Sequence, residues 1–366
     1  MIGQLLQKME QSALEEVWQV IGEELTGKER AWAIHLSLFP LVQRVLNPPF
    51  INPHLPKMYS IIREFVPYLH EDDIPPLIRL EISEYTRRPK AKALARPSRQ
   101  YPASFSRIEI AIREGETEKV AAFMLAFLEQ EGEKELARRL LLLGSGYLDR
   151  SLGHSVSCTA FILLEMIARS DQDPWPALGT MADYFCRGHY QSTPELRGAA
   201  DLLSDEEHEQ QLLRATSGSG IVNLHHIITR YAIERVRHLL SEAEYAHMID
   251  CWVEFLGDKS TEEPLAAVGA KAAVDYDSFY RCFAQRDELS ALSCLTGLIP
   301  TPEGRQQLGR YLLKGVCDRY QGDYNPHILT GLGSALWVVN RFHNRPLIAA
   351  NALRQYLNYF FSEIGS

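Results

Sequence analysis

The stretch SLGHSVSCTAFILL, at Ser151–Leu164, contains no charged residue and places a histidine near the start of an apolar run. Two later stretches repeat this arrangement: Ala215–Thr229 (ATSGSGIVNLHHIIT) and Tyr324–Asn340 (YNPHILTGLGSALWVVN). In each, a glycine, asparagine or proline lies shortly before the histidine, and these residue types are common where helices begin or end. The stretches predict buried helices that carry four histidines near their N-terminal ends: His154, His225, His226 and His327.

Helical periodicity continues along the rest of the chain. Apolar residues recur every three or four positions from Gln4–Glu24 onward, whereas few convincing runs alternate in the way that half-buried strands do. Asn47–Pro56 (NPPFINPHLP) is an exception, because its four prolines predict irregular structure before a helix that starts at Lys57. We therefore expect an all-α fold, a large multi-helix array or orthogonal bundle with a buried central pocket.

A basic segment suggests how the chain is divided. Thr86–Arg99 (TRRPKAKALARPSR) carries six basic residues and no acidic one. This composition is typical of an exposed linker, and a patch for an anionic ligand is the alternative. We place a domain boundary at its end, which gives an N-terminal helical lobe over residues 1–100 and a main helical domain with the candidate site over residues 101–366.

Composition excludes several classes of protein. The 366 residues have a net charge of −9, which argues against nucleic-acid binding, because that requires a basic face. The six cysteines occur singly, without a CxxC pair, so that a disulfide or structural-zinc framework is not expected. The N-terminus resembles an amphipathic helix and not a signal peptide, and no apolar run reaches the ~18–20 residues of a membrane span. We expect a cytoplasmic protein.

Common catalytic motifs are also missing. The sequence contains no GxxxxGK[ST], HExxH, GxSxG or CxxCH motif. Gly144-Ser145-Gly146 and Gly331-Leu332-Gly333 lack the third glycine of a dinucleotide loop and follow no predicted strand. These absences remove the commonest NTPase, zincin, α/β-hydrolase, c-type haem and Rossmann interpretations, and they leave the histidine helices as the main signal.

Helical geometry places further polar residues beside the histidines. A helix turns by about 100° per residue, so that His154 shares a face with Cys158 and Glu165, and His327 with Gly331 and Ser334. A histidine in the first turn also lies at the positive end of the helix dipole, which disfavours its protonated form. A neutral imidazole suits either a metal ligand or a general base.

The adjacent pair His225 and His226 points in directions about 100° apart, so that at most one of them should face a given site. Arg230 lies one turn beyond His226 beside an apolar run. A guanidinium in that position would stabilise a developing oxyanion.

Three short motifs resemble the questin oxidase-like family over roughly residues 144–345. They are Leu152-Gly153-His154, Leu224-His225-His226 and Asn325-Pro326-His327. The resemblance implies a helical oxidoreductase that uses oxygen to oxidise polyketide-derived aromatics, including Baeyer–Villiger-type opening of anthraquinones. The family's Asn-His-x-Pro type of block is not found in the first hundred residues, where Asn52–Pro56 (NPHLP) is a partial echo.

Together these features predict an oxygenase-type oxidoreductase that acts on an apolar or aromatic small molecule. The expected catalytic residues are His154, His226, Arg230 and His327. The candidate metal ligands are His154, His225, His226, His327 and Glu165. The histidines would hold a non-haem metal, with iron as the first choice, or act as general bases.

Two other classes of function stay open. One is a helical-repeat scaffold that binds a protein or peptide without chemistry, in which the histidines would be scattered and individually satisfied. The other, less favoured, is a haem protein with one axial histidine. We expect a small-molecule partner, no nucleic acid and no membrane span, and the sequence is compatible with a homodimer.

Overall fold

The computed structural model describes most of the chain. The described residues are 2–21, 25, 27–99, 101–196, 203–257, 264–265, 269, 274–320 and 325–364. Within these ranges every extended regular element is a helix, and the only β-type pairing is two isolated bridges. The all-α fold predicted from the periodicity is confirmed. No helix in the described ranges is both long enough and apolar enough to cross a membrane.

The helices fall into three groups along the chain. The N-terminal helices are α1 (Ile2–Glu10), α2 (Leu14–Ile21), α3 (Lys28–Ser37), α4 (Phe39–Val42), α5 (His54–Glu64) and α6 (Ile74–Thr86), with the 3-10 turns η2 (Val66–Tyr68) and η3 (Glu71–Asp73). The central helices are α7 (Phe105–Glu114), α8 (Thr117–Glu131), α9 (Glu133–Ser145), α10 (Leu148–Ser151), α11 (His154–Ala168), α12 (Trp175–Gly188), α13 (Asp205–Ser217), α14 (Gly220–Val236) and α15 (Glu242–Leu256), with η4 (Arg237–Leu239). The C-terminal helices are α16 (Tyr276–Ala284), α17 (Glu288–Thr296), α18 (Pro302–Arg319), α19 (His327–Arg341) and α20 (Pro346–Glu363).

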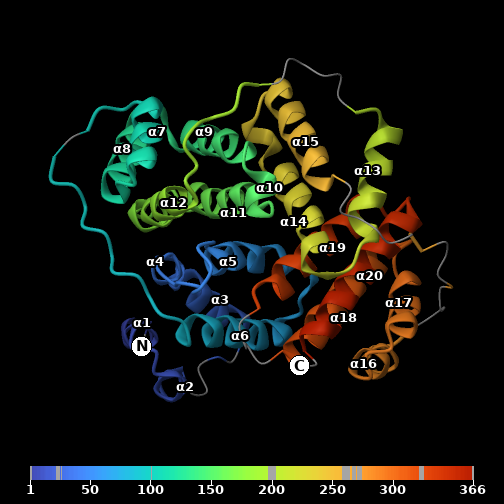
Figure 1. The fold of residues 1–366 in the computed structure, drawn as a ribbon. Coiled ribbons are helices and arrows are strands. Elements are labelled where there is room, and N and C mark those ends of the chain that lie inside the picture. The colour runs from blue at the N-terminus through green and yellow to red at the C-terminus, as the bar shows by residue number, and fades with distance from the viewer. Residues whose placement is uncertain are drawn as a thin grey trace.

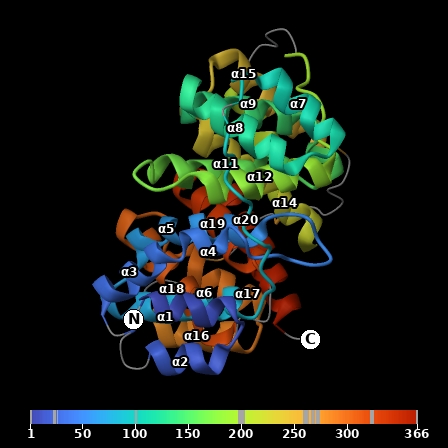
Figure 2. The same cartoon turned by 90° about the vertical axis from the view of Figure 1, so that its left-hand side faces the viewer.

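The two ends of the chain share one half of the molecule. In Figures 1 and 2 the blue N-terminal helices lie beside the orange and red C-terminal helices, and the green helices α7–α12 lie above them. Helix α5 packs against both α11 and α19, and α6 packs against α18. Residues 1–100 therefore contact elements from the middle and from the end of the sequence, across the boundary expected near residue 100.

Four helices form a closed ring that positions the candidate site. Helix α5 contacts α11, α11 contacts α14, α14 contacts α19, and α19 contacts α5. Small residues allow this close packing: a Cβ on Gly331 would lie 2.8 Å from the Leu224 side chain, and Gly153 has a left-handed φ of 73° and lies against Thr229. A histidine is the first residue of α5, α11 and α19, and His225 lies one turn into α14.

The start of α5 corrects the sequence prediction. Asn47–Pro56 was expected to be irregular throughout, but the helix begins at His54, three residues before Lys57. Proline is compatible with a first helical turn, because the backbone N–H groups of that turn have no intrahelical partner. Pro56 therefore lies inside the helix without breaking it.

Candidate functional site

Four histidine side chains meet near the N-terminal ends of α5, α11, α14 and α19. His54 Nε2 lies 2.6 Å from His154 Nε2, and His225 Nε2 lies 3.1 Å from the same atom. The ring centroid of His327 is 4.6 Å from that of His54 and 4.7 Å from that of His225. One ring nitrogen from each of His54, His154 and His327 fits within 4.8 Å of the others. We call these four residues the histidine cluster.

Hydrogen bonds to the backbone set the tautomers of two of these rings. The Nδ1 atoms of His154 and His225 lie 2.7 Å from the carbonyl oxygens of Ser151 and Ile221, respectively. A carbonyl only accepts hydrogen bonds, so that each Nδ1 carries the proton and each Nε2 is left with a lone pair. The lone pairs of these two Nε2 atoms face each other, and neither ring can donate a hydrogen bond to the other.

The orientation of the Asn47 amide sets the tautomer of the third ring, that of His54. Its Nδ2 atom lies 2.6 Å from His54 Nδ1, and its Oδ1 atom is buried without a hydrogen-bond partner among the described residues. In the orientation shown, the amide donates to Nδ1, and His54 then carries its proton on Nε2 and donates it to His154 Nε2. Rotating the amide by a half-turn would place the oxygen against Nδ1 and leave Nε2 bare, like those of the two neighbouring rings.

Burial keeps the cluster neutral. His54, His154 and His225 are at most 4% exposed, and His327 is partly exposed although its Nε2 atom is covered and has no partner among the described residues. Burial lowers the pKa of His225 to about 3 and that of the other three rings well below the ordinary value, and neighbouring positive groups add to the shift. An additional proton on the cluster is therefore disfavoured, whereas imidazole nitrogens with oriented lone pairs suit a metal ion.

A buried amine and a buried thiol lie near the rings. Lys57 is one turn from His54 on α5, and its fully buried Nζ atom has no hydrogen-bond partner among the described residues. Burial lowers the pKa of Lys57, and this amine contributes to the lowered pKa of all four rings. Cys158 lies one turn from His154, and burial raises the pKa of its thiol to about 11. Burial thus shifts Lys57 toward its neutral form and keeps the Cys158 thiol protonated.

A pocket with mostly apolar walls opens beside the histidine cluster. It is a cavity of about 450 Å³ whose wall includes Asn47, which contacts His54, and Tyr184. Its other walls are mostly apolar, with Pro40, Leu94 and Trp175 among them. A pocket of this size and character suits a small organic molecule.

The basic segment forms part of the pocket wall. Ala91–Leu94 lines the cavity, and the backbone of the segment is tied to its neighbours by hydrogen bonds from Ala91 N to Arg44 O (2.7 Å) and from Trp175 Nε1 to Leu94 O (2.9 Å). Figure 1 shows the segment after α6 as an extended trace that runs up the side of the molecule to α7. The segment predicted to be an exposed linker therefore also forms part of the cavity wall.

The structure brings together some of the predicted residues and separates others. His154, His225 and His327 belong to the histidine cluster. The ring of His226 instead packs 5.0 Å from that of Phe255, so that one member of the adjacent pair faces the cluster, as the helical rotation predicts. Arg230 is also not at the cluster, because its guanidinium donates to His208, Glu234 and Tyr245.

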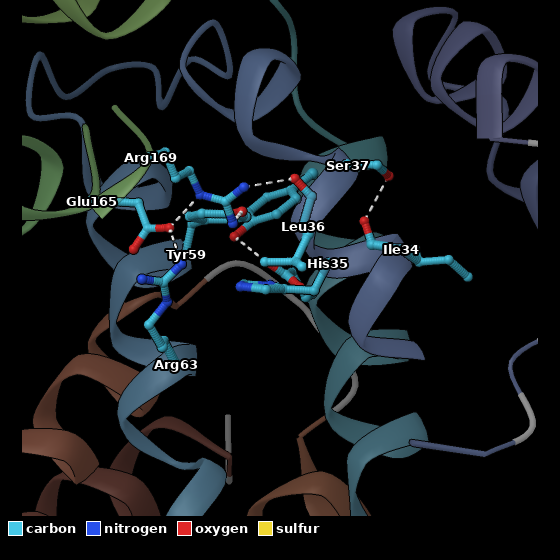
Figure 3. A network of polar contacts seen from close by, with 10 residues as sticks. Ile34, His35, Leu36, Ser37, Tyr59, Arg63, Glu165 and Arg169 are labelled. Atoms are coloured by element: carbon cyan, nitrogen blue, oxygen red, sulfur yellow. Dashed lines mark hydrogen bonds and ion pairs between the residues drawn. The ribbon is translucent and has the colours of Figure 1, made fainter. Parts of the chain in front are cut away.

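Glu165, expected to share a space with His154, lies in a different polar network. Its Oε1 atom accepts from Arg63 (2.9 Å) and from Arg169 (2.5 Å), and Arg169 also donates to the Tyr59 hydroxyl, as Figure 3 shows. Eleven residues separate Glu165 from His154 on α11, which corresponds to about 16 Å along the helix axis. The two side chains share a helix face but not a site.

The sequence analysis missed His54 as a site residue. Its signal is the tripeptide Asn52-Pro53-His54, which recurs as Asn325-Pro326-His327, and both copies start a helix that reaches the cluster. The prolines around His54 obscured the helix, and hence the match between the two tripeptides.

No protein-family model matches the chain, and neither a curated protein nor a solved structure was found to match it. The resemblance to the questin oxidase-like family therefore stays a prediction that rests on three short motifs.

Proposed function

We propose that the histidine cluster holds a single metal ion, with non-haem iron as the first choice, and that the protein is an oxygenase-type oxidoreductase. The substrate would be a small apolar or aromatic molecule in the adjoining pocket. One observation carries this proposal: the bare Nε2 atoms of His154 and His225 face each other at 3.1 Å, with both Nδ1 atoms committed to backbone carbonyls. This is the second-shell arrangement of metal-binding histidines.

The donor set limits the choice of metal. Imidazole nitrogens suit iron, zinc, copper and nickel, whereas calcium and magnesium prefer oxygen ligands. A ferrous ion held by these rings would supply the ability to react with dioxygen. The resemblance to an oxygen-using family supports iron among the candidates.

The chain's own residues would orient and protect the reaction. Asn47 joins His54 to the pocket wall and fixes the plane of that imidazole. The apolar walls exclude water from the bound substrate, which strengthens electrostatic interactions inside the pocket. A cluster ring that is not bound to metal would remain neutral and would serve as a general base.

The geometry argues against the alternative functions. Between neighbouring rings of the cluster the centroids are 4.5 to 4.7 Å apart, a spacing that suits an ion and leaves no space for a porphyrin between the rings. A scaffold without chemistry predicts scattered histidines, each with its own partner, in contrast to this convergence. A cytoplasmic location is part of the proposal and agrees with six unpaired cysteines.

Anaerobic titration of the metal-free protein with ferrous ion tests the proposal. We expect about one equivalent to bind, and nitric oxide should then give the EPR signal of a high-spin ferrous nitrosyl, because a catalytic metal keeps an open position. His225→Gln should weaken binding by at least about 100-fold, since second-shell changes alone cost 10–100-fold.

His226→Gln is the matched control, because it changes the neighbouring buried histidine on the same helix, outside the cluster. It should bind the ion like the wild type. Equal loss of binding in both variants, or no binding by the wild type, would overturn the proposal.

A further inference from the structure

An unpartnered amide lies in the wall of the pocket. Gln43 is only 4% exposed, yet neither its Nε2 nor its Oε1 atom has a hydrogen-bond partner within the described part of the chain. Burying both a donor and an acceptor without partners is costly, and native proteins rarely tolerate it. Gln43 lines the cavity, and a rotation of its side chain toward the cavity would let a bound molecule supply both partners.

The buried polar side chains of the pocket wall are amides, and most of its charged side chains form ion pairs. Among its charged residues, Arg44 forms an ion pair with Glu10, and Arg187 lies 3.3 Å from Asp183. The remaining one, Lys92, is exposed to solvent. The buried polar groups of the wall are those of neutral side chains, whereas its charged side chains are paired with each other or exposed. The pocket therefore suits a neutral ligand.

Gln43 lies in the same pocket wall as the residue that contacts the histidine cluster. Asn47 follows it by four residues in the same wall, has an unpartnered Oδ1 atom, and contacts His54 through Nδ2. A molecule whose polar edge engages Gln43 would thus be held in a pocket that borders the cluster through Asn47.

We propose that Gln43 is the specificity-determining residue of this pocket, and that it recognises a neutral planar molecule with a hydrogen-bond acceptor and a donor side by side. Carboxamides and lactams carry this pair. The Gln43 amide N–H donates to the ligand's carbonyl oxygen, and its Oε1 atom accepts from the ligand's N–H. This inference deepens the proposed function, since it names the chemical class of molecule that the same pocket takes.

Equilibrium binding of two probes to the full-length, metal-free protein tests the inference. The probes are 1-naphthamide, which has both groups, and 1-acetylnaphthalene, which keeps the carbonyl but lacks the donor. We expect the amide to bind at least about tenfold more tightly, because the ketone leaves a buried acceptor unpaired. In Gln43→Leu this preference should disappear, whereas Gln191→Leu, at an exposed glutamine outside the cavity, should keep it.

Several results would overturn the inference: equal affinities in the wild type, a preference that survives in Gln43→Leu, or no binding of either probe. A circular-dichroism spectrum and a thermal midpoint like those of the wild type would show that Gln43→Leu keeps its fold. The measurement needs no metal, so that amide selectivity without ferrous binding would refute only the metal centre. Ferrous binding without amide selectivity would refute only the role of Gln43.

Discussion

The same two helices, α5 and α11, carry two buried polar regions of opposite character. At their N-terminal ends, His54 and His154 meet in the histidine cluster. Toward their C-terminal ends, Arg63 and Glu165 meet in the ionic network of Figure 3. Between the two, the hydroxyl of Ser60 on α5 donates to the Phe161 carbonyl of α11, which keeps the helices in register.

The two regions differ in how their polar groups are paired. In the ionic network the Glu165 carboxylate faces two guanidinium groups, and Arg169 reaches a phenol and a backbone carbonyl as well. In the histidine cluster lone pairs face each other, and the buried amine of Lys57 has no hydrogen-bond partner within the described residues. The network is complete without a ligand, which indicates a structural role, whereas the metal ion proposed above would bind between the rings of the cluster.

The largest expected effect comes from breaking the ionic network around Glu165. Arg169→Met removes one partner from Glu165, which is only 4% exposed, and should lower the free energy of unfolding by about 3 kcal/mol. Chemical denaturation measures this change. The double variant Glu165→Gln/Arg169→Met should recover part of the loss, because it also removes a buried carboxylate that only the partly exposed Arg63 still pairs. A single variant as stable as the wild type would contradict the structural role of the network.

Removing the buried amine beside the histidine cluster should instead raise the free energy of unfolding. Lys57→Met removes a buried amine without a hydrogen-bond partner and keeps a similar volume, so that the metal-free protein should gain roughly 1–3 kcal/mol of stability at pH 7. Lys134→Met, at an exposed position on α9, should change stability by less than about 0.5 kcal/mol. If Lys57→Met instead destabilises the protein, the amine makes an interaction that stabilises the fold.

The cluster should also make the metal-free protein sensitive to mild acid. The folded-state pKa values of its four histidines are lowered, that of His225 to about 3. Below the unfolded-state value of about 6.5, the unfolded chain therefore binds protons that the folded protein excludes. The free energy of unfolding should fall between pH 6.5 and 5.5 by at least about 1 kcal/mol, since each fully shifted group contributes up to about 1.4 kcal/mol per pH unit.

Denaturation curves at several pH values measure this slope. His225→Gln should reduce it, and His343→Gln, at an exposed histidine, serves as the control. A flat profile across this pH range would mean that the rings are not held neutral by the fold.

Sequence patterns were sufficient for the fold and for part of the site. Periodicity predicted the helices, and the uncharged stretches located His154, His225 and His327 at buried helix starts. His54 was not predicted as a site residue, because the prolines around it indicated irregular structure. Its Asn-Pro-His tripeptide nevertheless matches the one at the start of α19. Glu165 shows a general limit: spacing on one helix determines which face a residue shares, but axial rise and tertiary partners decide which site it joins.

X-ray absorption spectroscopy of the ferrous-loaded protein tests the central claim most directly. We expect at least three nitrogen ligands at about 2.0–2.2 Å, with the multiple-scattering pattern of imidazole rings, and a clear loss of that pattern in His154→Gln. A first shell made only of oxygen atoms, or an unchanged spectrum in the variant, would contradict the assignment of the histidine cluster as a metal centre.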